Sequence, residues 1–229
     1  MLTNNQEKII RSLQTKKGRL ETGLCLVEGE KNVKETKDFL EYAFTPRDTK
    51  NFEKLVSTTT PQKIAGVARV PQWSEQDVLK KSIIVVLDGV QDPGNIGTIL
   101  RLCLGFKAAL ILVESADPAN SKVIRSSAGA FFKTPWLEVE RKSAPAFIKN
   151  LDRPVYRLEN KTADSADSLV LSSSIIKKLP KKMIIIAGSE GQGIKLKVPG
   201  TSLEINHDKA LESLNVATAL AIILHSLYK

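Results

Sequence analysis

Two short segments of this chain are almost entirely apolar, and they constrain the fold more than any other feature. They are IIVVL at 83–87 and MIIIA at 183–187. Apolar residues that continue without a polar face are typical of strands buried on both sides, as in a parallel sheet covered by helices. Both segments are followed by polar loops that contain glycine, and ligands of such sheets bind outside the carboxyl ends of the strands. The sequence therefore predicts an α/β fold with its site after Leu87 and Ala187.

The rest of the chain alternates between helix and strand patterns. After residue 82 we expect strands at 83–87, 109–113, 154–158, 183–187 and 202–205, and helices at 93–105, 120–128, 144–150, 171–178 and 213–228. The earlier residues predict a smaller α/β unit, with helices at 5–14 and 29–40 and strands at 23–28, 42–45 and 64–70. The polar, proline-containing PQWSE at 71–75 separates the two units. We therefore expect domains of 1–75 and 76–229, joined between about 71 and 81.

Composition excludes several classes of protein. Hydrophobic residues make up 42% of the chain, enough for a folded core, yet no apolar run approaches the roughly 20 residues that cross a bilayer. The opening MLTNNQEKII lacks the apolar core of a secretory signal. Cys25 and Cys103 lie far apart, and His207 and His225 are the only histidines. We therefore expect a cytoplasmic protein with neither a disulfide framework nor a metal centre.

Basic residues outnumber acidic ones by 34 to 25, which gives a formal net charge of +9. Protein surfaces with an excess of basic residues attract polyphosphates, partly through counterion release. Charge alone leaves two interpretations open, a nucleic-acid surface and a merely solubilising one. Two local groups stand out, one at the start of the chain and one late in it: Lys8, Arg11, Lys16, Lys17 and Arg19, and then Lys177, Lys178, Lys181 and Lys182.

The first candidate site is LDGVQDPGNIGTILR at 87–101. An aspartate–proline pair is a good helix start, and Gly94, Gly97 and Arg101 then share one face of the helix. Each glycine costs roughly 1 kcal/mol in a helix relative to alanine. We interpret the two glycines as a shelf that lets a phosphate or ribose approach Asn95 and Arg101. The alternative is that they only permit close packing.

Two further segments place polar residues at element ends. AGSEGQG at 187–193 holds Glu190 among three glycines, but it matches neither a P-loop nor a dinucleotide fingerprint. From Leu214 onward the last helix is apolar on nearly every side, so we expect it to be buried inside the fold or against another subunit. Ser213 could simply cap this helix, whereas the amide of Asn215, if buried, would need specific partners.

Together these segments resemble the motifs of one family, the SpoU/TrmH branch of the SPOUT RNA methyltransferases. The match covers about residues 82–228 and includes KVIRSSAGA at 122–130. Residues 1–75, with LVEGEKNVKE, resemble the small ribosomal-protein-like domain that binds RNA substrate in many members. The three ordered motifs are Asn95-x-Gly97-x-x-x-Arg101, Gly188-x-Glu190-x-x-Gly193 and Ser213-Leu214-Asn215-Val216.

The resemblance implies a fold, a cofactor and partners. The C-terminal part would be a parallel α/β domain tied in a deep trefoil knot. The protein would be a homodimer with each active site near the subunit interface. The methyl donor would be S-adenosylmethionine, and the acceptor would be a ribose 2′-hydroxyl of RNA. The two-domain layout favours ribosomal RNA over transfer RNA.

The resemblance also assigns roles to residues. Arg101 would clamp the phosphate beside the target ribose and stabilise the developing alkoxide, because a guanidinium keeps its proton at neutral pH. Asn95 and Ser213 would orient the hydroxyl or Arg101, and Asn215 and Glu190 would hold the surrounding loops. The residues expected to bind the donor are Ala187, Gly188, Ile205, His207, Ser213 and Leu214.

One departure from the family pattern concerns the donor site. The family has Ile-Pro-Met where this chain has Ile205-Asn206-His207, so a rigid proline and an apolar methionine are both replaced. The change could weaken donor binding or make it pH-sensitive, and we assign His207 no catalytic role. Three alternatives stay open: a transfer-RNA methyltransferase, an RNA-binding assembly factor of the same fold without methyl transfer, and an unrelated nucleotide-using α/β enzyme.

Overall fold

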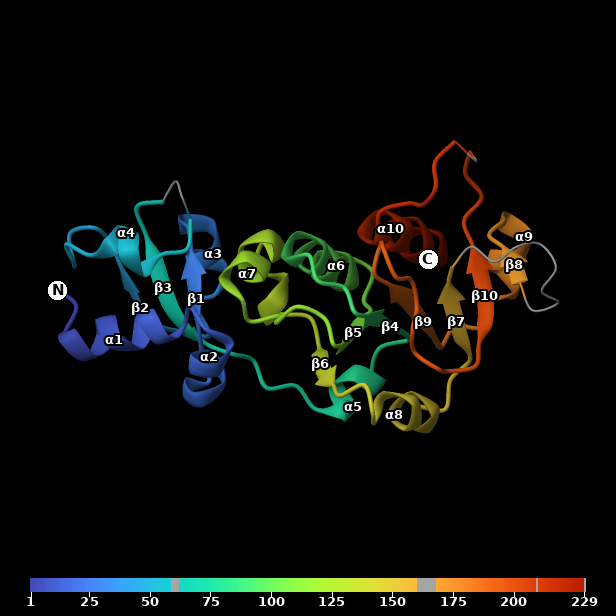
Figure 1. The fold of residues 1–229 in the computed structure, drawn as a ribbon, viewed down its shortest axis with the longest axis horizontal. Helices are drawn as coiled ribbons and strands as arrows, with labels where there is room; N and C mark the ends of the chain where they lie inside the picture. The colour runs from blue at the N-terminus through green and yellow to red at the C-terminus, as the bar shows by residue number, and fades with distance from the viewer. Residues whose placement is uncertain (59–61, 160–167, 209, 229) are drawn as a thin grey trace.

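The computed structural model describes residues 1–58, 62–159, 168–208 and 210–228. It contains two β-sheets, a small one at one end of the long axis and a large one that fills the rest of the molecule (Figure 1). None of the helices in these ranges combines the length and the apolar character needed to span a membrane.

The small sheet is antiparallel and belongs to the N-terminal unit. The elements of this unit are α1 (Asn4–Ser12), α2 (Lys16–Thr22), β1 (Leu24–Glu28), α3 (Glu30–Glu35), β2 (Leu40–Phe44), α4 (Phe52–Leu55) and β3 (Ala65–Arg69). The strand order is β1–β3–β2. Ile10 of α1, Phe44 of β2 and Leu55 of α4 pack together beneath the sheet, so the unit has an apolar core of its own.

The large sheet has seven strands, and every pair of neighbours runs parallel. Its strand order is β6–β5–β4–β9–β7–β10–β8. The elements of this C-terminal unit are α5 (Glu75–Leu79), β4 (Ile83–Asp88), α6 (Pro93–Gly105), β5 (Ala109–Val113), α7 (Ser121–Ser127), the 3₁₀ turn η1 (Ala130–Phe132), β6 (Trp136–Val139), α8 (Ala144–Asn150), β7 (Val155–Leu158), β8 (Ser168–Val170), α9 (Ser173–Lys178), β9 (Met183–Gly188), β10 (Thr201–Glu204) and α10 (Val216–Leu227).

The two apolar segments singled out in the sequence are neighbours in this sheet. They form β4 and β9, which pair in register from Ile83 and Met183 to Asp88 and Gly188. Helices cover both faces: α6, α7 and α10 pack on one, and α5 and α8 on the other (Figure 1). The prediction of a parallel α/β sheet is therefore confirmed.

Two strands of the sheet were not expected from the sequence. They are β6 and β8, at the two edges of the sheet. Only Trp136 of β6 is buried, and no residue of β8 is, so neither strand has a continuous apolar run that would mark it. The trefoil knot concerns how the loops pass through one another, which strand order alone does not define, and it stays a prediction.

The N-terminal sheet shares an apolar core with the large sheet through α7 and η1. Val27 of β1 and Ala68 of β3 belong to the same buried cluster as Val123 of α7. The ring of Phe39 lies 5.3 Å from that of Phe132, measured between centroids. The two units are therefore packed against each other rather than joined only by their linker.

Two ion pairs, each with at least one buried member, cross the same boundary. The Nε of Arg19 in α2 donates to Asp117 at 2.8 Å, and Arg19 is only 6% exposed. Its Nη1 also donates to the Leu13 carbonyl at 2.6 Å. Arg125 of α7 donates to the buried carboxylate of Glu28 at 2.9 Å. These contacts fix the orientation of the N-terminal unit, because a buried charge that loses its partner is costly.

We expect Arg19→Met to lower the free energy of unfolding by about 3 kcal/mol or more, because it strands the carboxylate of Asp117. The control is Arg69→Met, which removes an exposed ion pair with Glu41 and should cost no more than about 1 kcal/mol. Urea unfolding of both variants measures the difference. Equal destabilisation would contradict a structural role for the buried pair.

Candidate active site

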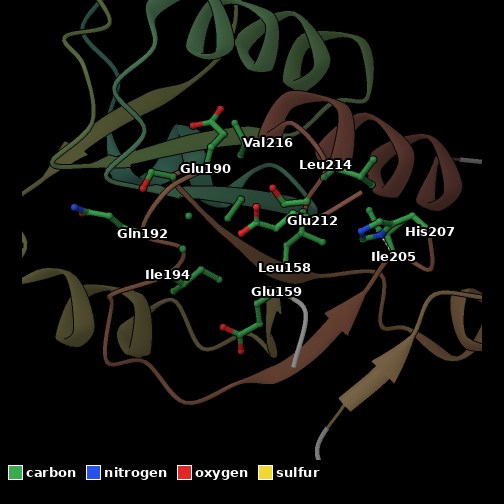
Figure 2. Close-up of a pocket in the computed structure, with 16 residues that line it drawn as sticks. Leu158, Glu159, Glu190, Gln192, Ile194, Ile205, His207, Glu212, Leu214 and Val216 are labelled. Atoms are coloured by element: carbon green, nitrogen blue, oxygen red, sulfur yellow. Dashed lines mark hydrogen bonds between the residues drawn. The ribbon is translucent and has the colours of Figure 1, made fainter. Parts of the chain in front are cut away.

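A cavity of about 460 Å³ opens where the carboxyl ends of β7, β9 and β10 meet the start of α10 (Figure 2). This is the edge at which parallel sheets bind ligands, and the volume is that of a small-molecule site. Its wall comes from stretches of chain far apart in the sequence: Leu158, Glu159, Ala187, Gly188, Ser189, Glu190, Gln192, Gly193, Ile194, Ile205, His207, Glu212, Ser213, Leu214, Val216 and Ala219.

The loop after β9 folds back on itself and forms one side of the cavity. A Cβ atom on Gly188 would lie 2.1 Å from the carbonyl carbon of Gly193, so the close approach of the two backbones requires glycine. Gly193 donates its N–H to the carbonyl of Ser189 at 2.9 Å and has a φ of +60°, in the left-handed region that favours glycine. Gly188 and Gly193 are therefore needed for the shape of this loop, which exposes backbone to the cavity.

A buried carboxylate fixes the end of this loop. Asp88, the last residue of β4, accepts hydrogen bonds from the backbone N–H groups of Lys195 and Leu196 at 2.6 and 2.7 Å. Its other oxygen accepts from Arg141 at 2.7 Å. Hydrogen bonds from Arg141 to Glu114 and to Asp88 raise the pKa of the guanidinium, which stays charged. The loop is thereby tied to the neighbouring strand.

A chain of side-chain hydrogen bonds connects the three motifs. Asn215 donates its Nδ2 to the Oδ1 of Asn95 at 3.0 Å, and Asn95 in turn donates to the carboxylate of Glu190. These residues lie 120 and 95 positions apart in the sequence. The first turn of α6, the glycine loop and the start of α10 therefore meet at one place.

The cavity wall is acidic. Among its described residues are three carboxylates, Glu159, Glu190 and Glu212, but no lysine or arginine. Figure 2 shows Glu190 and Glu159 on opposite sides of the cavity, with Glu212 between them. Glu159 also accepts hydrogen bonds from Arg157 and Ser202. Such a wall favours a cationic ligand, because carboxylates close to a positive charge lower its energy.

Neither thiol suits covalent catalysis. Cys25 and Cys103 are both buried, and burial raises the pKa of Cys103 to about 12 and that of Cys25 in the same direction. A thiol that keeps its proton at neutral pH is a poor nucleophile. In the part of the chain that the structure describes, no three metal-ligating side chains come together as a metal site.

The model of the SpoU rRNA Methylase family matches residues 82–225, which contain all three motifs. The chain belongs to this family. It is 29% identical over 251 residues to the 23S rRNA (guanosine(2553)-2′-O)-methyltransferase of Bacillus subtilis (strain 168), an alignment that covers 98% of this chain and 96% of that protein. The resemblance to the SpoU/TrmH branch is confirmed.

Solved structures share the whole SpoU architecture with this chain. A TrmH-family protein from Porphyromonas gingivalis has a TM-score of 0.80 at 30% identity, covering 99% of this chain and 98% of that one. An AdoMet-bound rRNA methyltransferase from Sinorhizobium meliloti has the same TM-score at 24% identity, covering 99% and 95%. At that lower identity the second likeness concerns the fold alone. Both likenesses include the N-terminal unit, since they extend over nearly the full chain.

The structure places the SpoU motif residues in three positions relative to the cavity. The six residues expected to bind the donor all line it, as does Glu190. Asn95 and Asn215 lie beside it, bound to each other. Arg101 is outside the wall: it is exposed on α6 and makes no hydrogen bond or ion pair with the described residues.

The start of the last helix differs from the expectation. Helix α10 begins at Val216, and Asn215 caps it by accepting from the N–H groups of Ala217 and Thr218 at 3.0 and 3.2 Å. Ser213 is therefore not the cap and instead lines the cavity. Asn215 is exposed rather than buried, and it finds its amide partner in Asn95.

One expected feature of the first motif has a packing role. Gly97 faces α7, where a Cβ atom would lie 1.9 Å from the Oγ of Ser126 and 2.8 Å from the backbone nitrogen of Ser127. The interpretation of Gly97 as part of a shelf for phosphate is wrong, and close helix packing explains it. Gly94 has no such neighbour, since its nearest contact is the side chain of Asp92.

Sequence reasoning missed several residues of the cavity. Leu158 ends the predicted strand 154–158 and Glu159 follows it, so the rule that placed the site after Leu87 and Ala187 could have found both. Glu212 and Gln192 carried no signal, because each is a single polar residue in a loop whose path depends on the tertiary structure.

Gly97→Ala should lower the free energy of unfolding by at least about 2 kcal/mol, because the added methyl group meets Ser126 and the backbone of α7. Gly105→Ala on the same helix is the matched control, since nothing lies within 4 Å of its Cβ position. It should leave stability unchanged or raise it slightly. Thermal or urea unfolding compares the two, and a neutral Gly97→Ala would restore the shelf interpretation.

Proposed function

We propose that this chain is an S-adenosylmethionine-dependent methyltransferase that methylates a ribose 2′-hydroxyl of ribosomal RNA in the cytoplasm. The observation that carries the proposal is an acidic cavity lined by the second and third SpoU motifs, with Asn95 of the first motif hydrogen-bonded to both beside it. Support for ribosomal RNA over transfer RNA comes from the full-length alignment with a 23S rRNA 2′-O-methyltransferase.

The cavity fits the donor in size, charge and surface. Its volume of about 460 Å³ suits a ligand of this size. Its three carboxylates suit a ligand with sulfonium and ammonium charges, and a related fold has been solved with AdoMet bound. Gly188, Ile205 and Leu214 would hold the donor through backbone groups. When bound, the donor supplies a methyl group on a positively charged sulfur.

His207 takes the place of the family's apolar methionine in this wall. Its Nδ1 donates to the carbonyl of Ile205 at 2.7 Å, so the imidazole is held by its own loop. The ring lies at the cavity wall as a polar surface, and no carboxylate among the described residues hydrogen-bonds to it. We therefore assign His207 to donor binding and not to catalysis.

The acceptor would be positioned from the side of α6. Arg101 binds the phosphate next to the target ribose through charge-assisted hydrogen bonds and stabilises negative charge on the attacking oxygen. Asn95 and Ser213 orient the hydroxyl, and Asn215 and Glu190 hold the loops through the hydrogen bonds described above. In-line alignment of a reactive donor accounts for most of what the protein must contribute.

We also propose that the N-terminal unit, residues 1–75, contributes to RNA binding. The structure narrows which of its basic residues are free to do so. Arg19 is buried against Asp117, and Lys16 forms an ion pair with Glu138 at 2.8 Å. Lys17 pairs with Glu21 at 3.8 Å, whereas Lys8 is exposed on α1 and forms no ion pair with the described residues.

A second copy of the chain would complete the site. Helices α6 and α10 pack together and leave Leu104, Ile222 and Tyr228 between 37% and 46% exposed. Arg101 lies on α6 as well, outside the wall of its own cavity. A homodimer through α6 and α10 covers the apolar side chains and surrounds Arg101 with a partner subunit.

The test of function is methyl transfer from labelled S-adenosylmethionine to ribosomal RNA, with mapping of 2′-O-methyl sites in cells with and without the gene. Arg101→Ala should lower turnover by about 100-fold or more, since it removes a preorganised donor of charge-assisted hydrogen bonds. The exposed Lys142→Ala should stay within about twofold of wild type. RNA binding without any transfer would instead favour the assembly factor.

The paired substitution Leu104→Glu and Ile222→Glu should convert the dimer to a monomer at micromolar concentration, because it buries charge at the proposed interface. Val170→Glu, at an exposed apolar position on β8, is the control and should leave the dimer intact. Sedimentation velocity measures both. A wild-type protein that sediments as a monomer would contradict the proposal.

A further inference from the structure

Four exposed lysines lie at the amino-terminal edge of the large sheet, opposite the cavity. Lys177 and Lys178 end α9, and Lys181 and Lys182 precede β9. We call these four the amino-edge lysine cluster. The cavity lies at the other ends of the strands, and β9 is six residues long, so about 20 Å of strand separates the two edges.

The pairing of β4 with β9 concentrates further positive charge here. The N–H of Met183 donates to the carbonyl of Ser82 at 3.1 Å, so the segment that carries Lys80 and Lys81 runs beside Lys181 and Lys182. Arg153, which precedes β7, donates to the carbonyl of Lys81 at 2.6 Å. The starts of three neighbouring strands therefore all carry basic residues.

The positive charge of the cluster is not neutralised within the described ranges. None of its four lysines forms an ion pair there. Lys80 differs, because it pairs with Asp77 at 2.9 Å. Asp152, at the start of the segment leading to β7, is on the same edge and pairs with none of the four lysines. The cluster is thus available to an external anion.

The chemistry of the cluster favours phosphate over an apolar or protein surface. None of the exposed large apolar side chains of the described residues lies within it. Lysine is depleted at protein–protein interfaces, whereas lysine contacts with phosphates supply much of the affinity of nucleic-acid binding. The acidic cavity wall repels a polyanion, so an RNA that presents a ribose there needs positive charge elsewhere.

We propose that the amino-edge lysine cluster binds the phosphate backbone of the RNA substrate. This rests on the proposed function and adds a property of the substrate: it is a folded RNA large enough to reach both edges of the sheet. The contact is independent of the N-terminal unit and reads phosphates rather than bases.

The experiment compares two fourfold variants at the cluster, K177Q/K178Q/K181Q/K182Q and K177R/K178R/K181R/K182R, for binding to a transcript of a complete ribosomal RNA domain without methyl donor. The glutamine variant should bind about 10-fold more weakly at low salt. Its log–log salt slope should be shallower by about 2 to 3, since each lost phosphate contact removes about 0.9. The arginine variant keeps the charge and should bind like wild type.

Unchanged affinity and slope in the glutamine variant would overturn the proposal, and so would an equal loss in both variants. Loss of binding to phosphatidylserine vesicles with unchanged RNA binding would assign the cluster to a membrane surface instead. Because the assay needs no methyl donor, its failure is distinct from failure of the proposed function, which would show as absent transfer in the wild-type protein.

Discussion

The site depends on the hydrogen bonds that the buried carboxylate of Asp88 accepts. Asp88 is 2% exposed, and a buried charge must keep its partners or lose several kcal/mol. Its partners are the backbone N–H groups of Lys195 and Leu196 and the guanidinium of Arg141. Because Asp88 ends β4, these bonds decide where the chain returns after the glycine loop, and therefore where the cavity wall stands.

Parallel strand direction separates the charges of the protein. All seven strands end at one edge, where loops bring Glu159, Glu190 and Glu212 around the cavity. The same strands begin at the opposite edge, where the amino-edge lysine cluster lies. A protein with a net charge of +9 can thus offer an acidic pocket to a cation while its other surfaces attract a polyanion.

Strands that are long and buried on both faces were predicted correctly from the sequence, whereas the short, half-exposed strands at the edges of the sheet were missed. The runs that became β4 and β9 are buried along their whole length, so their apolar pattern was unambiguous. The edge strands β6 and β8 are short and half-exposed, so their residues show no apolar pattern from which a strand could be predicted. Glycines were harder to interpret, because a glycine that admits a ligand and one that admits a neighbouring helix are identical in sequence. Gly97 is of the second kind.

Local apolar patterns and motif spacing are enough to predict the parallel α/β fold, the edge of the sheet that holds the site and the membership in the SpoU family. The folded chain was needed to see that Asn215, Asn95 and Glu190 form one hydrogen-bonded chain, and that Arg19 is buried as the partner of Asp117. The physical reason is that a hydrogen bond or ion pair depends on distance in space. Residues about 100 positions apart reach that distance only after the chain has folded.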